Sequence, residues 1–186
     1  MTEVKFFAKY EQMHSFPHPQ KSSKYLPHYF KSCPQQIDDD PSSGTVKRCV
    51  PFLDALTNGF IIPLWAECRV VATNGNINIQ FPQNLAMAES VSNHSFDQIK
   101  GHPLSESKYG TIPLKWINPW GIETPKGYSC LITSPLNHMQ TKFKILDGIV
   151  DTDSYYNQIN FPFIWTGGDG DFTFPKGMPL VQVIPF

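Results

Sequence analysis

The chain has 186 residues, a mass of 21.1 kDa and a formal net charge of −1, the size of one ordinary domain. Its 17 prolines would break the long helices of a bundle, and its 13% aromatic content is too high for a disordered chain. The balanced charge also argues against a basic nucleic-acid-binding domain, so we expect no nucleic-acid partner.

Targeting signals and metal motifs are not apparent in the sequence. The N-terminal residues lack the apolar stretch of a secretory signal, and no run reaches the ~20 apolar residues of a membrane helix. We therefore expect a chain that is not secreted and has no membrane partner. The four cysteines contain no CxxC pair, which predicts reduced thiols rather than a zinc framework: Cys33, Cys49, Cys68 and Cys130.

The first 50 residues are expected to form a strand followed by an arm. Residues 3–10 alternate apolar and polar side chains, which predicts a half-buried strand. Residues 11–50 lose this period, yet they keep several aromatic side chains and five prolines. This composition predicts an extended, Pro-rich arm that lies on the domain or on a neighbouring subunit.

A short helix and a strand are expected next. Pro51 suits a first helical turn and Gly59 suits the position after a helix end, so residues 51–58 are predicted to be helical. Residues 60–65 are predominantly apolar and predict a strand. Because proline cannot donate to a sheet ladder, Pro63 should mark an edge or a bulge of that strand.

The middle of the chain contains a clear hairpin signal. Residues 68–73 and 76–81 flank Asn74-Gly75, a pair typical of a type I′ turn. A short helix is predicted over residues 84–91, and a polar loop over residues 92–111.

The C-terminal part predicts a series of short strands bounded by Pro, Gly or Asn. Residues 167–170, Gly-Gly-Asp-Gly, are expected to form a hairpin loop between two of them. Short strands at this spacing indicate an all-β barrel or sandwich. We therefore predict a single domain over 1–186, with a β-rich core at 51–186. The expected strands are 112–117, 127–134, 143–150, 158–165, 171–174 and 179–184.

Three sequence phrases in this region resemble the dUTPase and dCTP-deaminase superfamily, whose fold is the β-clip. The phrases are Thr124-Pro125-Lys126-Gly127-Tyr128, Gly148-Ile149-Val150-Asp151-Thr152-Asp153-Ser154-Tyr155, and Pro175-Lys176-Gly177-Met178-Pro179-Leu180-Val181-Gln182-Val183. The resemblance covers about residues 120–184 and implies a β-clip barrel that assembles as a homo-oligomer such as a trimer. The apolar last strand, which we expect to be exposed, also favours an oligomer.

The resemblance also implies roles for particular residues. Asp151 would orient or activate a water molecule, and Tyr155 would stack on a sugar. The phosphate-binding arginine of the superfamily is absent from the turn at 133–138, and neither Arg48 nor Arg69 is near the three phrases. Triphosphate recognition requires such cations, so hydrolysis of dUTP is not favoured. The candidate residues for a small polar ligand around Asp151 are Ser134, Asn137, His138, Asp153, Tyr155 and Gln182.

Two interpretations of Asp151 and Asp153 stay open. Carboxylates two residues apart on a strand share one face, where they can bind a metal or share a proton. Alternatively, the two side chains cap backbone amides and simply build a hairpin. Other metal candidates are weaker, so we predict no metal site and leave the cofactor unknown. The weaker metal candidates are the set His14, His18, His28 and Cys33 for zinc, and the pair Asp169 and Asp171 for calcium.

The whole chain also resembles an uncharacterised family of marine phages and bacteria. The residues that carry this resemblance are 47–56, 59–64 and 179–186. It implies a viral origin and a location in the host-cell cytoplasm or the virion. The leading hypothesis is a non-enzymatic binding or structural protein of viral type. The alternative is a hydrolase or sensor for a nucleotide or small molecule, with a degenerate dUTPase-like site.

Overall fold

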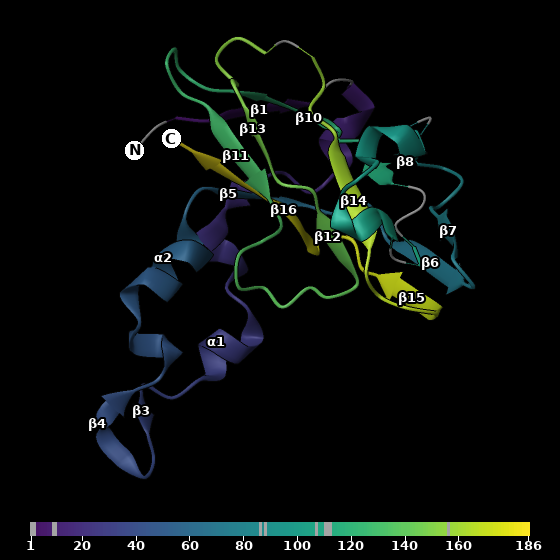
Figure 1. The fold of residues 1–186 in the computed structure, drawn as a ribbon. Coiled ribbons are helices and arrows are strands. Elements are labelled where there is room, and N and C mark those ends of the chain that lie inside the picture. The colour runs from purple at the N-terminus through teal and green to yellow at the C-terminus, as the bar shows by residue number, and fades with distance from the viewer. Residues whose placement is uncertain are drawn as a thin grey trace.

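The computed structural model describes residues 3–8, 11–85, 87, 89–106, 108–109, 113–155 and 157–186, and strands dominate it (Figure 1). Within these ranges, the strands form five antiparallel sheets. The largest has five strands in the order β13 (Gly148–Val150), β11 (Cys130–Thr133), β16 (Pro179–Pro185), β5 (Phe60–Pro63) and β2 (Gln20–Lys21).

Three further sheets complete the body. A four-stranded sheet has the order β12 (Phe143–Ile145), β14 (Phe161–Trp165), β9 (Leu114–Trp116) and β8 (Val91–Asn93). A three-stranded sheet has the order β15 (Gly170–Phe174), β6 (Cys68–Thr73) and β7 (Asn76–Gln80). A two-stranded ribbon pairs β1 (Lys5–Ala8) with β10 (Trp120–Glu123).

Helices are short and lie mostly outside the sheets. Among the described residues, the two α-helices are α1 (His28–Ser32) and α2 (Val50–Thr57). The 3-10 helices are η1 (Glu11–Ser15), η2 (Ser22–Tyr25), η3 (Val46–Arg48), η4 (Phe96–Ile99) and η5 (Pro103–Glu106).

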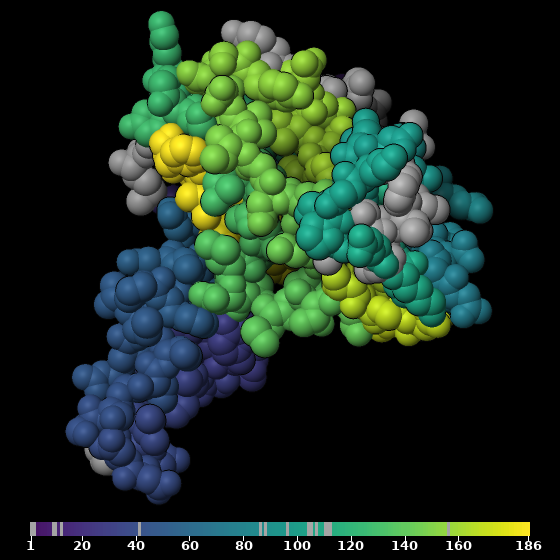
Figure 2. All heavy atoms as spheres, viewed as in Figure 1, coloured from purple at the N-terminus to yellow at the C-terminus, as the bar shows by residue number. Residues whose placement is uncertain are grey.

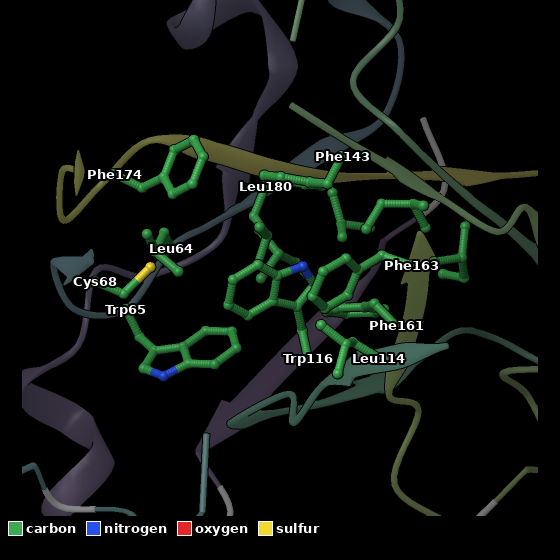
Figure 3. Packing of buried hydrophobic residues seen from close by; sticks show 14 of the residues in the cluster. Leu64, Trp65, Cys68, Leu114, Trp116, Phe143, Phe161, Phe163, Phe174 and Leu180 are labelled. Atoms are coloured by element: carbon green, nitrogen blue, oxygen red, sulfur yellow. The ribbon is translucent and has the colours of Figure 1, made fainter. Parts of the chain in front are cut away.

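Aromatic side chains from several sheets meet in one core (Figure 3). The rings of Trp116 and Phe163 stack with their centroids 4.6 Å apart, and Phe143 packs edge-on against both. Trp65 and Trp116 expose 0% and 1% of their surfaces. Burying such large apolar side chains contributes about 25 cal/mol per Å² removed from water, so this cluster holds the sheets together.

The all-β class is confirmed, whereas the barrel is not seen, since no sheet closes into a ring among the described residues. The predicted hairpin at 167–170 is wrong. The strand after it, β15, pairs with β6 rather than with β14, so the glycines carry the chain from one sheet to another. The predicted strand at 143–150 is also interrupted, because β12 and β13 belong to different sheets.

Local predictions in the middle of the chain are largely confirmed. The hairpin of β6 and β7 turns at Asn74 and Gly75, whose φ angles are 51° and 85°. Helix α2 matches the prediction for 51–58 within a residue at each end. The register of β16 shifts opposite Pro63, which is the expected bulge.

Four predictions fall partly on residues outside the description. Of the helix predicted at 84–91, residues 84, 85, 87, 89 and 90 are not helical and Val91 begins β8, while Ala86 and Ala88 lie outside the described residues. The loop predicted at 92–111 contains most of β8 and two 3-10 helices, with Ser107, Gly110 and Thr111 outside the description. The ends of the strands predicted at 3–10 and 112–117, namely Lys9, Tyr10 and Ile112, also lie outside it.

The N-terminal arm divides into two parts. Residues 11–27 lie on the body, where Met13 and Phe16 are buried and β2 joins the edge of the five-stranded sheet. The buried Phe30 ring of α1 lies at the base of the arm instead, where it stacks on Phe52 of α2 and contacts Lys47. Residues 31–50, which we call the projecting arm, extend away from the body (Figures 1 and 2). They contain the hairpin of β3 (Gln36–Ile37) and β4 (Asp40–Gly44).

The last strand differs from its expected role. Strand β16 lies in the middle of the five-stranded sheet, and its residues 180–183 are buried. Its apolar character is therefore explained by the core of the same chain. An oligomer would therefore have to use another surface.

Candidate functional site

The two aspartates of the second phrase lie in a turn that follows β13. The backbone N–H groups of Ser154 and Tyr155 donate to the carbonyl oxygen of Asp151, at 3.0 and 2.8 Å. The Asp151 carboxylate accepts a hydrogen bond from the Ser129 hydroxyl at 2.7 Å. Strand β13 ends at Val150, so the two aspartates do not lie on a strand as the metal-binding interpretation assumes.

Asp153 uses both carboxylate oxygens inside the chain. Oδ2 accepts from the Gly127 backbone N–H at 2.8 Å, and Oδ1 accepts from the Ser154 hydroxyl at 2.9 Å. The Gly127 N–H, followed by the Ser154 hydroxyl, holds the pKa of Asp153 below its usual value because both stabilise the charged form. Asp153 thus caps a backbone amide, as the second interpretation of the aspartate pair expects, whereas the Asp151 carboxylate accepts from a side-chain hydroxyl.

Gln182 lies away from the aspartates and connects three segments. Its side chain is 0% exposed. Nε2 donates to the carbonyl oxygens of Ala55 and Asn58 at 3.0 and 2.7 Å, and Oε1 accepts from the Leu136 N–H at 2.8 Å. All of these bonds are made within the chain, so the amide holds α2 and the 135–138 turn against β16.

The other three predicted ligand residues lie in or beside that same turn. The Ser134 hydroxyl accepts a hydrogen bond from the Ile145 N–H at 3.0 Å. Asn137 has a φ of 58°, and its carbonyl oxygen accepts from the Tyr29 hydroxyl. His138 Nε2 is buried without a hydrogen-bond partner in the described part of the chain, and burial lowers the pKa of this imidazole.

A pocket of about 230 Å³ lies between β10 and the 152–158 loop. Of the predicted site residues, Asp153 and Tyr155 line it, and the other five do not. The structure therefore separates the predicted site into two groups. The lining residues are Phe7, Trp120, Gly121, Ile122, Glu123, Thr152, Asp153, Ser154, Tyr155, Asn157 and Gln158.

The β1–β10 ribbon forms one wall of this pocket. Phe7 lies directly opposite Gly121 in the register of the two strands. A Cβ atom at Gly121 would stand 2.2 Å from the Phe7 ring, so the ring lies over the glycine because no side chain occupies that place. The glycine thus allows an exposed aromatic ring to cover the strand.

Trp120 contributes a buried aromatic side chain to the lining. Its side chain is 1% exposed, and its ring centroid lies 4.4 Å from that of His18. The indole Nε1 is buried and has no hydrogen-bond partner among the residues described. An unpartnered buried donor costs about 1–3 kcal/mol, which makes it an unusual feature of a pocket wall.

Sequence reasoning missed Phe7 and Trp120 as pocket residues. One signal was present, because Phe7 falls on the same face of its strand as Lys5, where a polar residue is expected. The separation of 113 positions between Phe7 and Trp120 hides their proximity from any local pattern.

Within the described ranges, no three His, Cys, Asp or Glu side chains gather to hold a metal ion. The same ranges include no helix with the length and apolar character of a membrane span. Comparisons of the chain with protein-family models, with curated proteins and with solved structures find no match.

Proposed function

We propose that this chain is a non-enzymatic structural protein that self-associates through its projecting arm, residues 31–50. The observation that carries the proposal is the exposure of this arm: none of its described side chains is buried, although it contains a hairpin and leads into α2. A two-stranded hairpin alone in water is marginally stable. A partner that packs on the arm would supply the missing contacts.

The surface of the arm suits a second copy of the same chain. Val50 is 64% exposed, and Ile37 is also largely exposed. The charges are of both signs: Arg48, Asp38 and Asp39 are exposed and form no ion pair with any described residue. An arm that carries apolar side chains and both charges is complementary to itself, which favours a contact between copies.

The geometry around Asp151 favours this role over catalysis. Ser129 and Gly127 already engage the carboxylates of Asp151 and Asp153, as hydrogen-bonded turns require. The pocket that holds Asp153 and Tyr155 presents no Lys, Arg or His among its described lining residues, so a triphosphate would meet negative charge there. A nucleotide hydrolase is the less favoured alternative.

The finer parts of the proposal rest on sequence resemblance. Residues 124–183 support a scaffold of the β-clip type and a trimeric assembly, and the phage-like segments 47–56 and 179–186 support a role in a virion or in the host-cell cytoplasm. Detection of the chain in purified particles, at a constant ratio to the other particle proteins, would support the virion. Its complete loss during particle purification would contradict that location.

Sedimentation velocity on matched variants tests the arm. Val50→Asp places a charge in the exposed surface of the arm. The variant should keep the fold, because Val50 lies in the first turn of α2, where a carboxylate stabilises the helix. The control is Ile149→Asp on β13, because Ile149 is 66% exposed on the body. We expect wild type and the control to sediment at a multiple of 21.1 kDa. The dissociation constant of Val50→Asp should rise at least ~10-fold.

Two results would contradict the proposal. A wild-type chain that stays monomeric at ~100 μM has no self-association of useful strength. Dissociation caused by Ile149→Asp but not by Val50→Asp would place the contact on the five-stranded sheet instead of the arm. Far-UV circular dichroism of each variant verifies that the fold is kept.

A further inference from the structure

The pocket between β10 and the 152–158 loop combines negative charge with aromatic walls. Asp153 and Glu123 supply two carboxylates, and the described lining residues supply no cationic side chain. Phe7 and Tyr155 supply exposed aromatic rings. We propose that this pocket binds a small organic cation of the alkylammonium or arylammonium class. This inference is independent of the self-association proposed for the arm.

Hydrogen bonds stabilise the charge of one of the two carboxylates, that of Asp153. The Gly127 N–H and then the Ser154 hydroxyl hold the pKa of Asp153 below its usual value, and the charge of Lys126 adds a smaller effect in the same direction. Glu123 is exposed and makes no ion pair with any described residue. Lys5 is opposite Glu123 in the strand register, and both residues line a neighbouring hollow, but Lys5 does not line this pocket.

The aromatic residues suit a cation more than a neutral apolar molecule. The negative face of an aromatic ring attracts an ammonium group, and this attraction is stronger where water is excluded. Tyr155 is 44% exposed, so a large part of its ring surface is open to a ligand.

The size of the pocket limits the ligand. A volume of about 230 Å³ is below the ~300–1,000 Å³ typical of sites for drug-sized molecules. It is large enough for a small ammonium compound that also carries a hydroxyl group. A nucleotide would bring phosphates next to two carboxylates, which disfavours binding by like-charge repulsion.

Calorimetric titration of the full chain with matched probes tests the charge requirement. The probes are choline, its neutral isostere 3,3-dimethylbutanol, and AMP as an anion. We expect choline to bind at least ~10-fold more tightly than the isostere, because the shape is equal and only the positive charge differs. AMP is expected not to bind at the pocket.

Variants then locate the binding site. Tyr155→Leu and Glu123→Gln should each weaken choline binding about 2–5-fold, since each removes one partly exposed contact to the cation. The matched control is Tyr128→Leu, because Tyr128 is similarly exposed but does not line the pocket. Both Tyr155 and Glu123 lie at the surface and make no side-chain hydrogen bond that these variants would break in the described structure.

Several results would overturn the inference. Equal affinity for choline and 3,3-dimethylbutanol would remove the role of charge, and the absence of choline binding at ~10 mM would remove the site. Tighter binding of AMP than of choline would favour a nucleotide ligand. An equal loss of affinity in Tyr128→Leu and Tyr155→Leu would place the ligand outside the pocket.

Discussion

Replacing Gln182 by methionine tests whether this buried residue has a structural role. Methionine keeps the length of the side chain but removes both Nε2 donor bonds and the Oε1 acceptor bond. Asn58 keeps a hydrogen bond to its carbonyl oxygen from the Ser22 hydroxyl, at 2.8 Å. The carbonyl of Ala55 and the N–H of Leu136 lose the partner that Gln182 provides.

The expected cost follows from those two backbone groups. Both groups are part-buried, so each lost partner should cost at least about 1 kcal/mol, the lower end of the range for buried groups, which gives a loss of at least roughly 2 kcal/mol in the free energy of unfolding for Gln182→Met. For a chain of 186 residues, about 1 kcal/mol corresponds to ~2–4 °C in Tm, so Tm should fall by at least ~4 °C.

Thermal and urea denaturation followed by circular dichroism measure this loss. Gln158→Met is a useful comparison, since Gln158 is a half-buried glutamine of the pocket rather than of the β16 sheet. A Tm of Gln182→Met within ~1 °C of wild type would refute the reasoning, because the three bonds would then contribute nothing to stability.

Three further predictions concern single sites. Gly59→Ala should lower the free energy of unfolding by at least ~2 kcal/mol, because φ is +67° and the new Cβ would lie 2.1 Å from a backbone oxygen of β16. The comparison is Gly127→Ala, where the surroundings are open, and a loss for Gly59→Ala no larger than that of Gly127→Ala in urea unfolding would contradict this. Burial lowers the pKa of His138 below its ordinary value of 6.5, so the unfolded chain takes up the proton first and the free energy of unfolding should fall as the pH drops below about 6.5. A free energy of unfolding that falls with pH at the same slope in His138→Phe would refute the assignment. Burial, with a smaller effect of a neighbouring glutamate, raises the pKa of Cys68 to about 12, and burial also raises the pKa of Cys130. Ellman's reagent at pH 8 should therefore label Cys33 and Cys49 quickly, and Cys68 and Cys130 only on unfolding. Four fast thiols would be inconsistent with the structure.

Features set by neighbouring residues could be predicted from the sequence. Asn74-Gly75 specifies its turn through two positive φ angles, and Pro51 with Gly59 marks the ends of α2 within a residue. The bulge opposite Pro63 follows from the missing N–H of proline. Each of these depends on a backbone property that one or two residues determine.

Strand partners could not be predicted in the same way. The glycines at 167–170 indicate a turn, but they do not specify that β15 leaves β14 and pairs with β6, about 100 positions earlier. That choice depends on long-range packing of the aromatic core, to which Phe174 and Trp165 both contribute. A local pattern of hydrophobicity contains no information on which distant strand lies alongside.

The candidate site shows the same division. Capping of a backbone amide by Asp153 was one of two interpretations of the sequence, because an aspartate after a strand commonly bonds nearby N–H groups. The pocket wall formed by Phe7 over Gly121 depends on the β1–β10 register, which joins positions 114 residues apart. The buried, partnerless indole of Trp120 likewise becomes visible only in three dimensions.

Hydrogen–deuterium exchange across a dilution series tests the central claim, self-association through the projecting arm, most directly. If residues 31–50 are covered by a second copy, their amides should exchange slowly at ~100 μM and at least ~10-fold faster once the chain is diluted below its dissociation constant. Amides of the body strands β11 and β16 should exchange at the same rate throughout. Arm amides that exchange equally fast at every concentration, with no protection at ~100 μM, would contradict the account.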